Sequence, residues 1–257
     1  ESGHRRYTTE QVRWLRRVAE ALALGYRPSK VVPLSAPKIA ALIDEGAAAH
    51  DARPAVSEVI RCAAAFDGPG IRRILAAELA ARGPRGLLEQ LIAPVLEAIG
   101  DRWVKGELDI RHERFVSGLL GDELREIRRG LPIAEDAPLA VFATLSGEDH
   151  DLGIQMAATV GKLDGLDALL LGTGLPHEQI AEAASEMGAR VVALSVSLAT
   201  GGVQTDRVVL ELRRLLPSPI RLVVGGRGAR GVRRGPRGVD YLESFDEFGT
   251  WIRRLDR

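Results

Sequence analysis

Short apolar runs and amphipathic segments alternate along the C-terminal half of the chain. The apolar runs cover residues 139–145, 167–171, 190–196, 220–224 and 239–242. Segments with helical spacing of apolar positions lie between and after them, at residues 153–163, 178–187, 204–215 and 248–255. Short, continuous apolar runs are typical of strands that are buried on both faces. The alternation therefore predicts an α/β domain built on a doubly wound parallel sheet.

The N-terminal half has helical periodicity instead. Apolar positions predict a bundle of four helices at about residues 55–65, 69–82, 86–104 and 110–128. Upstream, Thr8 and Gln11 have the spacing of a capping box at the start of a helix over residues 8–24. A second short helix is predicted between Ser35 and Gly46.

These patterns divide the chain into three expected domains. Residues 1–46 form an N-terminal head, residues 54–131 the helical bundle, and residues 137–257 the sheet domain, with a proline-containing linker before the last. The fold class expected is thus α/β, with a helical bundle before the doubly wound, Rossmann-like sheet.

Composition narrows the classes of function. Lys and Arg together number 35, and so do Asp and Glu, so the chain as a whole is not a polyelectrolyte. Basic residues are concentrated in residues 1–17 and 221–237, and either stretch can meet phosphate or form a solvated face. Cys62 is the only cysteine, which excludes an internal disulfide. No apolar run has the length of a membrane span and no signal-peptide pattern is present, so a cytoplasmic location without membrane contact is expected.

Three short pieces of sequence carry the candidate chemistry, and each follows a predicted strand. They are Glu148-x-His150-x-x-Gly153, Ser195-x-Ser197 and Gly225-Gly226. Ligands in such sheets sit beyond the carboxyl ends of the strands. A neutral imidazole at His150 suits a metal, and a carboxylate on its second nitrogen raises its basicity and fixes its tautomer. Taken alone, a pattern as short as the first piece equally suits an ordinary loop histidine and a turn glycine.

Together these pieces resemble the cobalamin-binding module shared by methionine synthase, coenzyme-B12-type mutases and cobalamin-dependent regulators. The resemblance covers residues 137–257. It implies that His150 binds cobalt from below, that Glu148 orients His150, and that the benzimidazole tail enters a slot in the sheet. The other cofactor contacts it implies are Asp149, Gly153, Thr173, Gly174, Ser195, Ser197, Gly225 and Gly226. Glu148 stands where the family more often has Asp.

The bundle resembles the cap of MerR-type, light-sensing cobalamin regulators. Trp103 is followed ten residues later by Glu113, as in that family, which implies contacts from both to the upper adenosyl ligand. Arg114 replaces the family's histidine, and Val104 stands where some relatives carry another. His112 does not substitute for the missing histidine, because a two-residue offset places it on a different face of the helix.

The N-terminus resembles the wing and later helices of the MerR-type DNA-binding domain. The resemblance implies that Arg5, Arg6 and Tyr7 contact DNA phosphates. The preceding helix-turn-helix is missing, so the chain is expected to start inside a partial winged-helix head and the base-reading helix cannot be located.

The leading hypothesis is a homo-oligomeric, adenosylcobalamin-binding photoreceptor and transcriptional regulator, which is not an enzyme. In it, light cleaves the cobalt–carbon bond and changes oligomeric state and DNA binding. A rival hypothesis is a corrinoid carrier protein for methyl transfer. A third is a cobalamin sensor with a second, bilin chromophore, for which Arg114 offers a partner to a propionate. No Ser-His-Asp set or dinucleotide fingerprint favours other chemistry.

Overall fold

A computed structural model describes most of the chain, which forms two compact units. The described residues are 8, 11, 14, 15, 17, 18, 21, 26, 28–42, 53–105, 107–229 and 237–255. The first unit spans residues 1–74 and 90–115, and the second spans residues 75–89 and 116–257.

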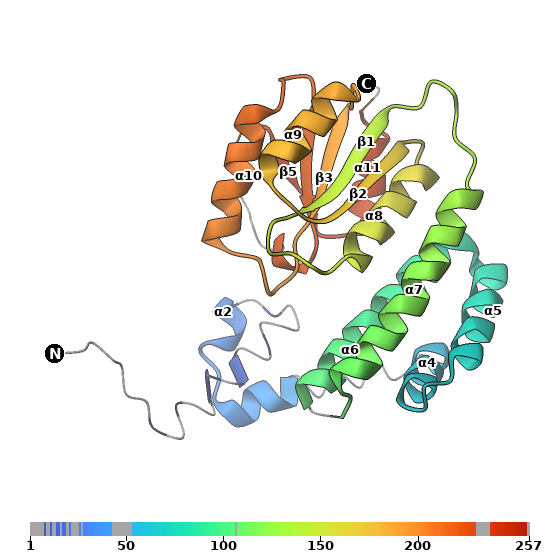
Figure 1. The fold of residues 1–257 in the computed structure, drawn as a ribbon. Helices are drawn as coiled ribbons and strands as arrows, with labels where there is room; N and C mark the ends of the chain where they lie inside the picture. The colour runs from blue at the N-terminus through green and yellow to red at the C-terminus, as the bar shows by residue number, and fades with distance from the viewer. Residues whose placement is uncertain are drawn as a thin grey trace. The chain divides into compact units, whose positions relative to one another are not determined.

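The second unit contains the predicted parallel sheet. Its strands are β1 (Leu139–Leu145), β2 (Asp167–Leu175), β3 (Val191–Ser195), β4 (Arg221–Gly225) and β5 (Val239–Tyr241). They are all parallel and lie in the order β2-β1-β3-β4-β5 (Figure 1). The doubly wound fold is therefore confirmed. The order of the strands reverses between β1 and β3, which makes the carboxyl ends of these two strands the switch point at which such sheets bind ligands.

Two pairs of helices cover the sheet. They are α8 (Leu152–Leu163), α9 (His177–Glu186), α10 (Val203–Leu215) and α11 (Phe245–Ile252). Helices α9 and α10 pack together on one face, and α8 and α11 pack together on the other (Figure 1). The predicted bounds agree to within about three residues, except that β2 continues to Leu175 instead of ending at residue 171.

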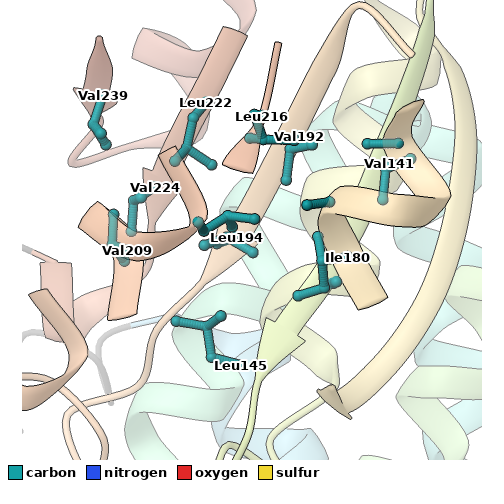
Figure 2. Packing of buried hydrophobic residues seen from close by; sticks show 14 of the residues in the cluster. Val141, Leu145, Ile180, Val192, Leu194, Val209, Leu216, Leu222, Val224 and Val239 are labelled. Atoms are coloured by element: carbon teal, nitrogen blue, oxygen red, sulfur yellow. The ribbon is translucent and has the colours of Figure 1, made fainter. Parts of the chain in front are cut away.

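Alternate strand residues form the core beneath α9 and α10. Figure 2 shows Val192 and Leu194 of β3 between Val141 of β1 and Val224 of β4. Ile180 of α9 and residues of α10 pack onto them. Because side chains alternate between the faces of a strand, the intervening Phe142 points to the opposite face, where its ring meets Phe248 of α11 with centroids 6.3 Å apart. Each fully buried side chain of this size contributes about 1.5–3 kcal/mol to folding, so this core stabilises the sheet whose edge carries the loops.

The bundle helices largely follow the apolar periodicity. They are α4 (Pro54–Ala64), α5 (Gly68–Leu87), a π-helical turn (Leu88–Ile92), α6 (Ala93–Lys105) and α7 (Ile110–Gly130). The predicted break at Gly83–Pro84 is confirmed as a kink in which Gly83 has φ 68° and ψ 178°. The segment predicted as one helix over residues 86–104 begins instead with the π-helical turn. In the first unit, α4 packs against α6.

The head has a small core of its own. Val18, Ala21, Val31 and Ile39 are buried together, around the short α2 (Pro28–Val31), which the sequence did not predict. The predicted capping box is confirmed, because the Thr8 N–H donates to Gln11 Oε1 (2.8 Å) and the Gln11 N–H donates to Thr8 Oγ1 (3.2 Å).

Two basic segments that can meet phosphate lie wholly or partly outside the described residues. Arg5, Arg6 and Tyr7 lie outside the described residues, as does the middle of the basic stretch 221–237. Among the helices of the described part of the chain, none has both the length and the apolar character that crossing a bilayer requires.

Candidate functional site

The structure brings His150 and Glu148 together in the loop between β1 and α8, at the switch point of the sheet. The His150 Nδ1 atom lies 2.6 Å from Glu148 Oε1, and the His150 backbone N–H donates to the same oxygen at 3.1 Å. The imidazole is 67% exposed, whereas the Glu148 side chain is only 3% exposed. A buried carboxylate therefore holds one edge of a ring whose remainder faces outward.

The second oxygen of Glu148 holds the loop after β3. The Ser197 backbone N–H donates to Glu148 Oε2 at 2.6 Å, and the Thr200 hydroxyl donates to the same atom. Burial alone would raise the pKa of Glu148, but the hydrogen bonds from His150, Thr200 and Ser197 outweigh it and lower the pKa to about 2. Glu148 is thus ionised at neutral pH and can only accept hydrogen bonds.

This ionisation fixes the tautomer of His150. Because the carboxylate accepts, Nδ1 carries the proton and the lone pair of the neutral ring is on Nε2. A carboxylate on the second nitrogen also increases the basicity of the coordinating nitrogen. The pair is therefore arranged as a metal ligand with its supporting acid.

Three of the predicted glycines, Gly153, Gly225 and Gly226, lie next to the end of β3 or the loop that follows it. A Cβ atom on Gly153 would lie 2.6 Å from Ser195 Oγ, so the start of α8 touches the end of β3. A Cβ atom on Gly226 would overlap the Val196 carbonyl oxygen, and Gly226 has φ +98°. Gly225 is less crowded, with the Leu242 carbonyl oxygen 3.8 Å from such a Cβ. Gly153 thus serves a contact between the start of α8 and the end of β3, and Gly226 serves a contact between the loops after β4 and β3.

The end of β2 is open. A Cβ atom on Gly172 would meet nothing within 4 Å, and one on Gly174 would meet only Asp149 Oδ1, at 3.9 Å. Asp149 is exposed and Thr173 is partly buried. This open strand end, next to the loop that carries His150, leaves room for a ligand larger than a single metal ion.

The candidate residues of the bundle are placed in the first unit. Trp103, near the end of α6, is 55% exposed. Glu113 on α7 is partly buried and lies 3.6 Å from the Arg114 guanidinium. His112 is buried, stacks on Phe66 with centroids 4.6 Å apart, and accepts a hydrogen bond at Nδ1 from the Asp109 N–H at 3.0 Å. His112 thus caps the start of α7 and packs inside the unit, whereas Arg114 is exposed.

Two family models match the chain on either side of residue 130. Both are described as B12 binding domain, one over residues 55–121 and the other over residues 138–244. This chain carries a B12-binding module. The match over the sheet contains all three strand-end pieces, and the match over the bundle contains Trp103 and Glu113.

The B12-binding module has relatives of two kinds. The chain is 27% identical to the HTH-type transcriptional repressor CarH of Myxococcus xanthus, over 89% of this chain and 79% of the relative. It is 28% identical to CarA, a repressor of the same organism, over 71% of this chain and 62% of the relative. It is also 25% identical to dimethylamine corrinoid protein 3 of Methanosarcina acetivorans, over 64% and 79% of the two chains. The monomethylamine corrinoid protein of Methanosarcina barkeri shares the fold, with a TM-score of 0.57 at 16% identity, over 75% of this chain and 94% of the other.

The residues of the module fit a corrinoid. Among the described residues, no group of three or more His, Cys, Asp or Glu side chains is placed to hold a metal ion. His150 instead offers one imidazole with its lone pair on Nε2, which suits a metal that arrives already held by a ring of nitrogens. The open glycines at the end of β2 lie next to Asp149, in the same loop as that imidazole.

Sequence reasoning missed two residues of the module. Thr200 is a direct partner of Glu148, and Thr144 ties the His150 loop to the end of β2. The only signal for Thr200 was its position in the loop that follows Ser195 and Ser197, and nothing in the local sequence distinguished Thr144 from other strand residues.

Gly226→Ala is expected to lower the free energy of unfolding by more than about 2 kcal/mol. The added methyl group would overlap the Val196 carbonyl at a backbone conformation that alanine rarely adopts. Gly118→Ala is the matched control, because Gly118 lies in α7 with open space around it and should gain about 0.5–1 kcal/mol from the better helix propensity of alanine. Urea unfolding of both variants measures the difference. Equal stability of the two variants would show that the contact of residue 226 with the loop after β3 does not require glycine.

Proposed function

We propose that this chain is the sensor part of a cobalamin-dependent, light-responsive transcriptional regulator, and that adenosylcobalamin is its cofactor. The observation that carries the proposal is the Glu148–His150 pair at the switch point of the sheet, with its 2.6 Å contact. In this proposal Nε2 of His150 would coordinate the cobalt, and Glu148 would set the basicity and orientation of the imidazole. Adenosylcobalamin would supply a cobalt–carbon bond that green light breaks.

The choice of a regulator rests on the extent of the resemblance. The similarity to CarH extends over 89% of this chain, whereas that to the dimethylamine corrinoid protein extends over 64%. The head also has a separate apolar core, in which the Trp14 indole N–H donates to the Leu34 carbonyl at 2.8 Å. A folded head before the bundle is consistent with a DNA-binding element, and we propose phosphate contacts for Arg5, Arg6 and Tyr7.

The remaining residues receive roles by the same proposal. Trp103 and Glu113 would act on the upper ligand, and the exposed indole is available for such a contact. We also propose cofactor contacts for the residues at the strand ends. These are Asp149, Gly153, Thr173, Gly174, Ser195, Ser197, Gly225 and Gly226. We further propose that the chain forms homo-oligomers, and that light changes their oligomeric state and their binding to DNA.

The test is illumination of the loaded protein. The chain is reconstituted in the dark with adenosylcobalamin, and its absorption spectrum and its mass in solution are measured before and after green light. We expect a change in the spectrum together with a change in oligomeric state. A spectrum and a mass that both stay the same after illumination would refute the sensor. A bilin chromophore would appear as a further absorption band at long wavelength after incubation with biliverdin.

A corrinoid carrier for methyl transfer is the second candidate. It is favoured by the shared fold with the monomethylamine corrinoid protein. In a carrier, the methyl group would leave cobalt in the dark when a methyl acceptor and a methyltransferase are added. Such turnover without light, together with no response to illumination, would refute the proposal of a regulator and support that of a carrier.

A further inference from the structure

Thr144 is a buried polar residue at the point where the His150 loop leaves the sheet. It lies near the end of β1 and has no exposed surface. Its hydroxyl donates to the Glu148 carbonyl oxygen at 2.7 Å and accepts from the Gly174 N–H at 3.0 Å. One hydroxyl therefore joins the backbone of the β1 loop to the backbone at the end of β2.

The sheet itself does not make this connection in a regular way. The pairing of β1 with β2 shifts register between Phe142 and Ala143 and again between Ala143 and Leu145. Thr144 stands inside this irregular stretch. Its side chain therefore supplies hydrogen bonds to backbone groups where the ladder is interrupted, as buried backbone groups require.

Thr159 is a buried threonine whose hydroxyl forms a hydrogen bond within its own helix. It also has no exposed surface, and its hydroxyl donates to the Gln155 carbonyl at 2.9 Å, within α8. That bond joins residues four apart on one helix. The bonds of Thr144 instead join Glu148 and Gly174, which are 26 residues apart and belong to two different segments.

The two residues to which the Thr144 hydroxyl is bonded, Glu148 and Gly174, belong to the candidate site. Glu148, whose carbonyl Thr144 holds, carries His150 on its carboxylate. Gly174, whose N–H Thr144 accepts, belongs to the open end of β2 next to Asp149. A flat ligand that is bound by His150 and extends over the neighbouring strand end needs these two parts of the edge at a fixed separation.

We propose that Thr144 is a positioning residue for His150, which holds the β1 loop and the glycine end of β2 in the register that a corrin ring requires. This inference rests on the proposed function. Thr144 touches neither metal nor ring in this role and acts through the backbone of Glu148 and Gly174. Loss of its hydroxyl frees both groups at once, so the imidazole and the open strand end move independently.

The test compares Thr144→Val, which removes the hydroxyl at nearly constant volume, with Thr144→Ser, which keeps it. Thr159→Val is the matched control. We expect Thr144→Val to weaken the binding of hydroxocobalamin by about tenfold, the size typical for residues that orient a metal ligand, and to lower the fraction of bound cobalamin with the absorption spectrum of histidine ligation. Hydrogen exchange at the Gly174 amide should accelerate by at least about tenfold. Thr144→Ser and Thr159→Val should bind hydroxocobalamin as the wild type does.

Either of two results would overturn the inference. One is a Thr144→Val protein with wild-type affinity and spectrum but faster exchange at Gly174, which would make the hydroxyl purely structural. The other is a Thr144→Ser protein as weak as Thr144→Val. If Thr144→Val does not fold, Thr144→Ala, which also removes the hydroxyl, takes its place in the comparison with Thr144→Ser and Thr159→Val.

The same variants separate this inference from the proposed function. A wild-type protein that takes up no cobalamin would refute the proposed function, whatever Thr144 does. The ring ¹⁵N signals of His150 in the ligand-free protein then test the positioning role by themselves. They should shift in Thr144→Val and not in Thr159→Val, and identical signals in both would overturn the role of Thr144.

Discussion

Replacing His150 with alanine is expected to weaken cobalamin binding by more than about 100-fold, because residues that merely orient a metal ligand already contribute up to that factor. The imidazole lies at the switch point, is 67% exposed and is held by an ionised carboxylate. In the proposed site, the variant would leave the cobalt without a ligand from the protein. The absorption spectrum of any cobalamin still bound should therefore differ from that of the wild type. Titration of each protein with hydroxocobalamin, followed by absorption, measures both effects.

His177→Ala is the matched control for this experiment. His177 belongs to the same sheet domain and also contacts a carboxylate, with its Nδ1 atom 3.2 Å from Glu178 Oε2. It lies at the start of α9, and no strand-end piece of the candidate site includes it. We expect wild-type affinity and spectrum from His177→Ala. Tight binding with an unaltered spectrum in His150→Ala would remove the basis of the proposed function.

The part of this site that the sequence predicted is the part encoded locally. Glu148 and His150 are two residues apart in a loop after a buried strand, and a carboxylate at that distance can bend back to the ring. The strand ends converge because parallel strands share one carboxyl edge. The pairing of the two residues therefore required only the order of elements along the chain.

Thr200 and Thr144 depended on information that the local sequence does not contain. Thr200 is 52 residues from Glu148, and it reaches the carboxylate only because β3 lies next to β1 and the loop after β3 folds back. Thr144 acts at a register shift in the pairing of β1 with β2, and hydrophobic periodicity does not reveal register irregularities. Composition marks both residues only as small polar side chains.

Two other differences have the same origin. Gly172 and Gly174 suggest a turn, yet β2 continues through them to Leu175, because both glycines adopt positive φ while the pairing with β1 goes on. The π-helical turn at Leu88–Ile92 contains ordinary helix formers, and its wider winding follows a kink at Gly83 that sequence placed correctly. Propensity located the elements, and tertiary contacts determined their ends.

Glu148→Gln is expected to affect both binding and stability. The amide replaces one accepting oxygen with a donor, so it cannot accept from His150, Ser197 and Thr200 together. The imidazole then loses its orienting carboxylate, and we expect hydroxocobalamin to bind about 10–100-fold more weakly. Thr200→Val should cost about 1.5–3 kcal/mol of stability, as expected for one hydrogen bond to a charged group, with a smaller loss of affinity. Glu178→Gln is the matched control, because Glu178 is an exposed carboxylate beside a histidine.

The effect of Glu148→Gln on stability should depend on pH in a defined direction. Folding lowers the pKa of Glu148 from 4.5 to about 2, through hydrogen bonds that outweigh its burial. A carboxylate with a lowered pKa contributes stability that is fully present above the unfolded value and is lost as the pH falls towards the folded one. At neutral pH the ionised group therefore contributes about 3 kcal/mol. The difference in unfolding free energy between wild type and Glu148→Gln should be largest above pH 4.5 and should shrink as the pH falls towards 2. Urea unfolding at several pH values measures it, and a difference that stays constant over this range would mean that the charge of Glu148 does not hold the loops of β1 and β3 together.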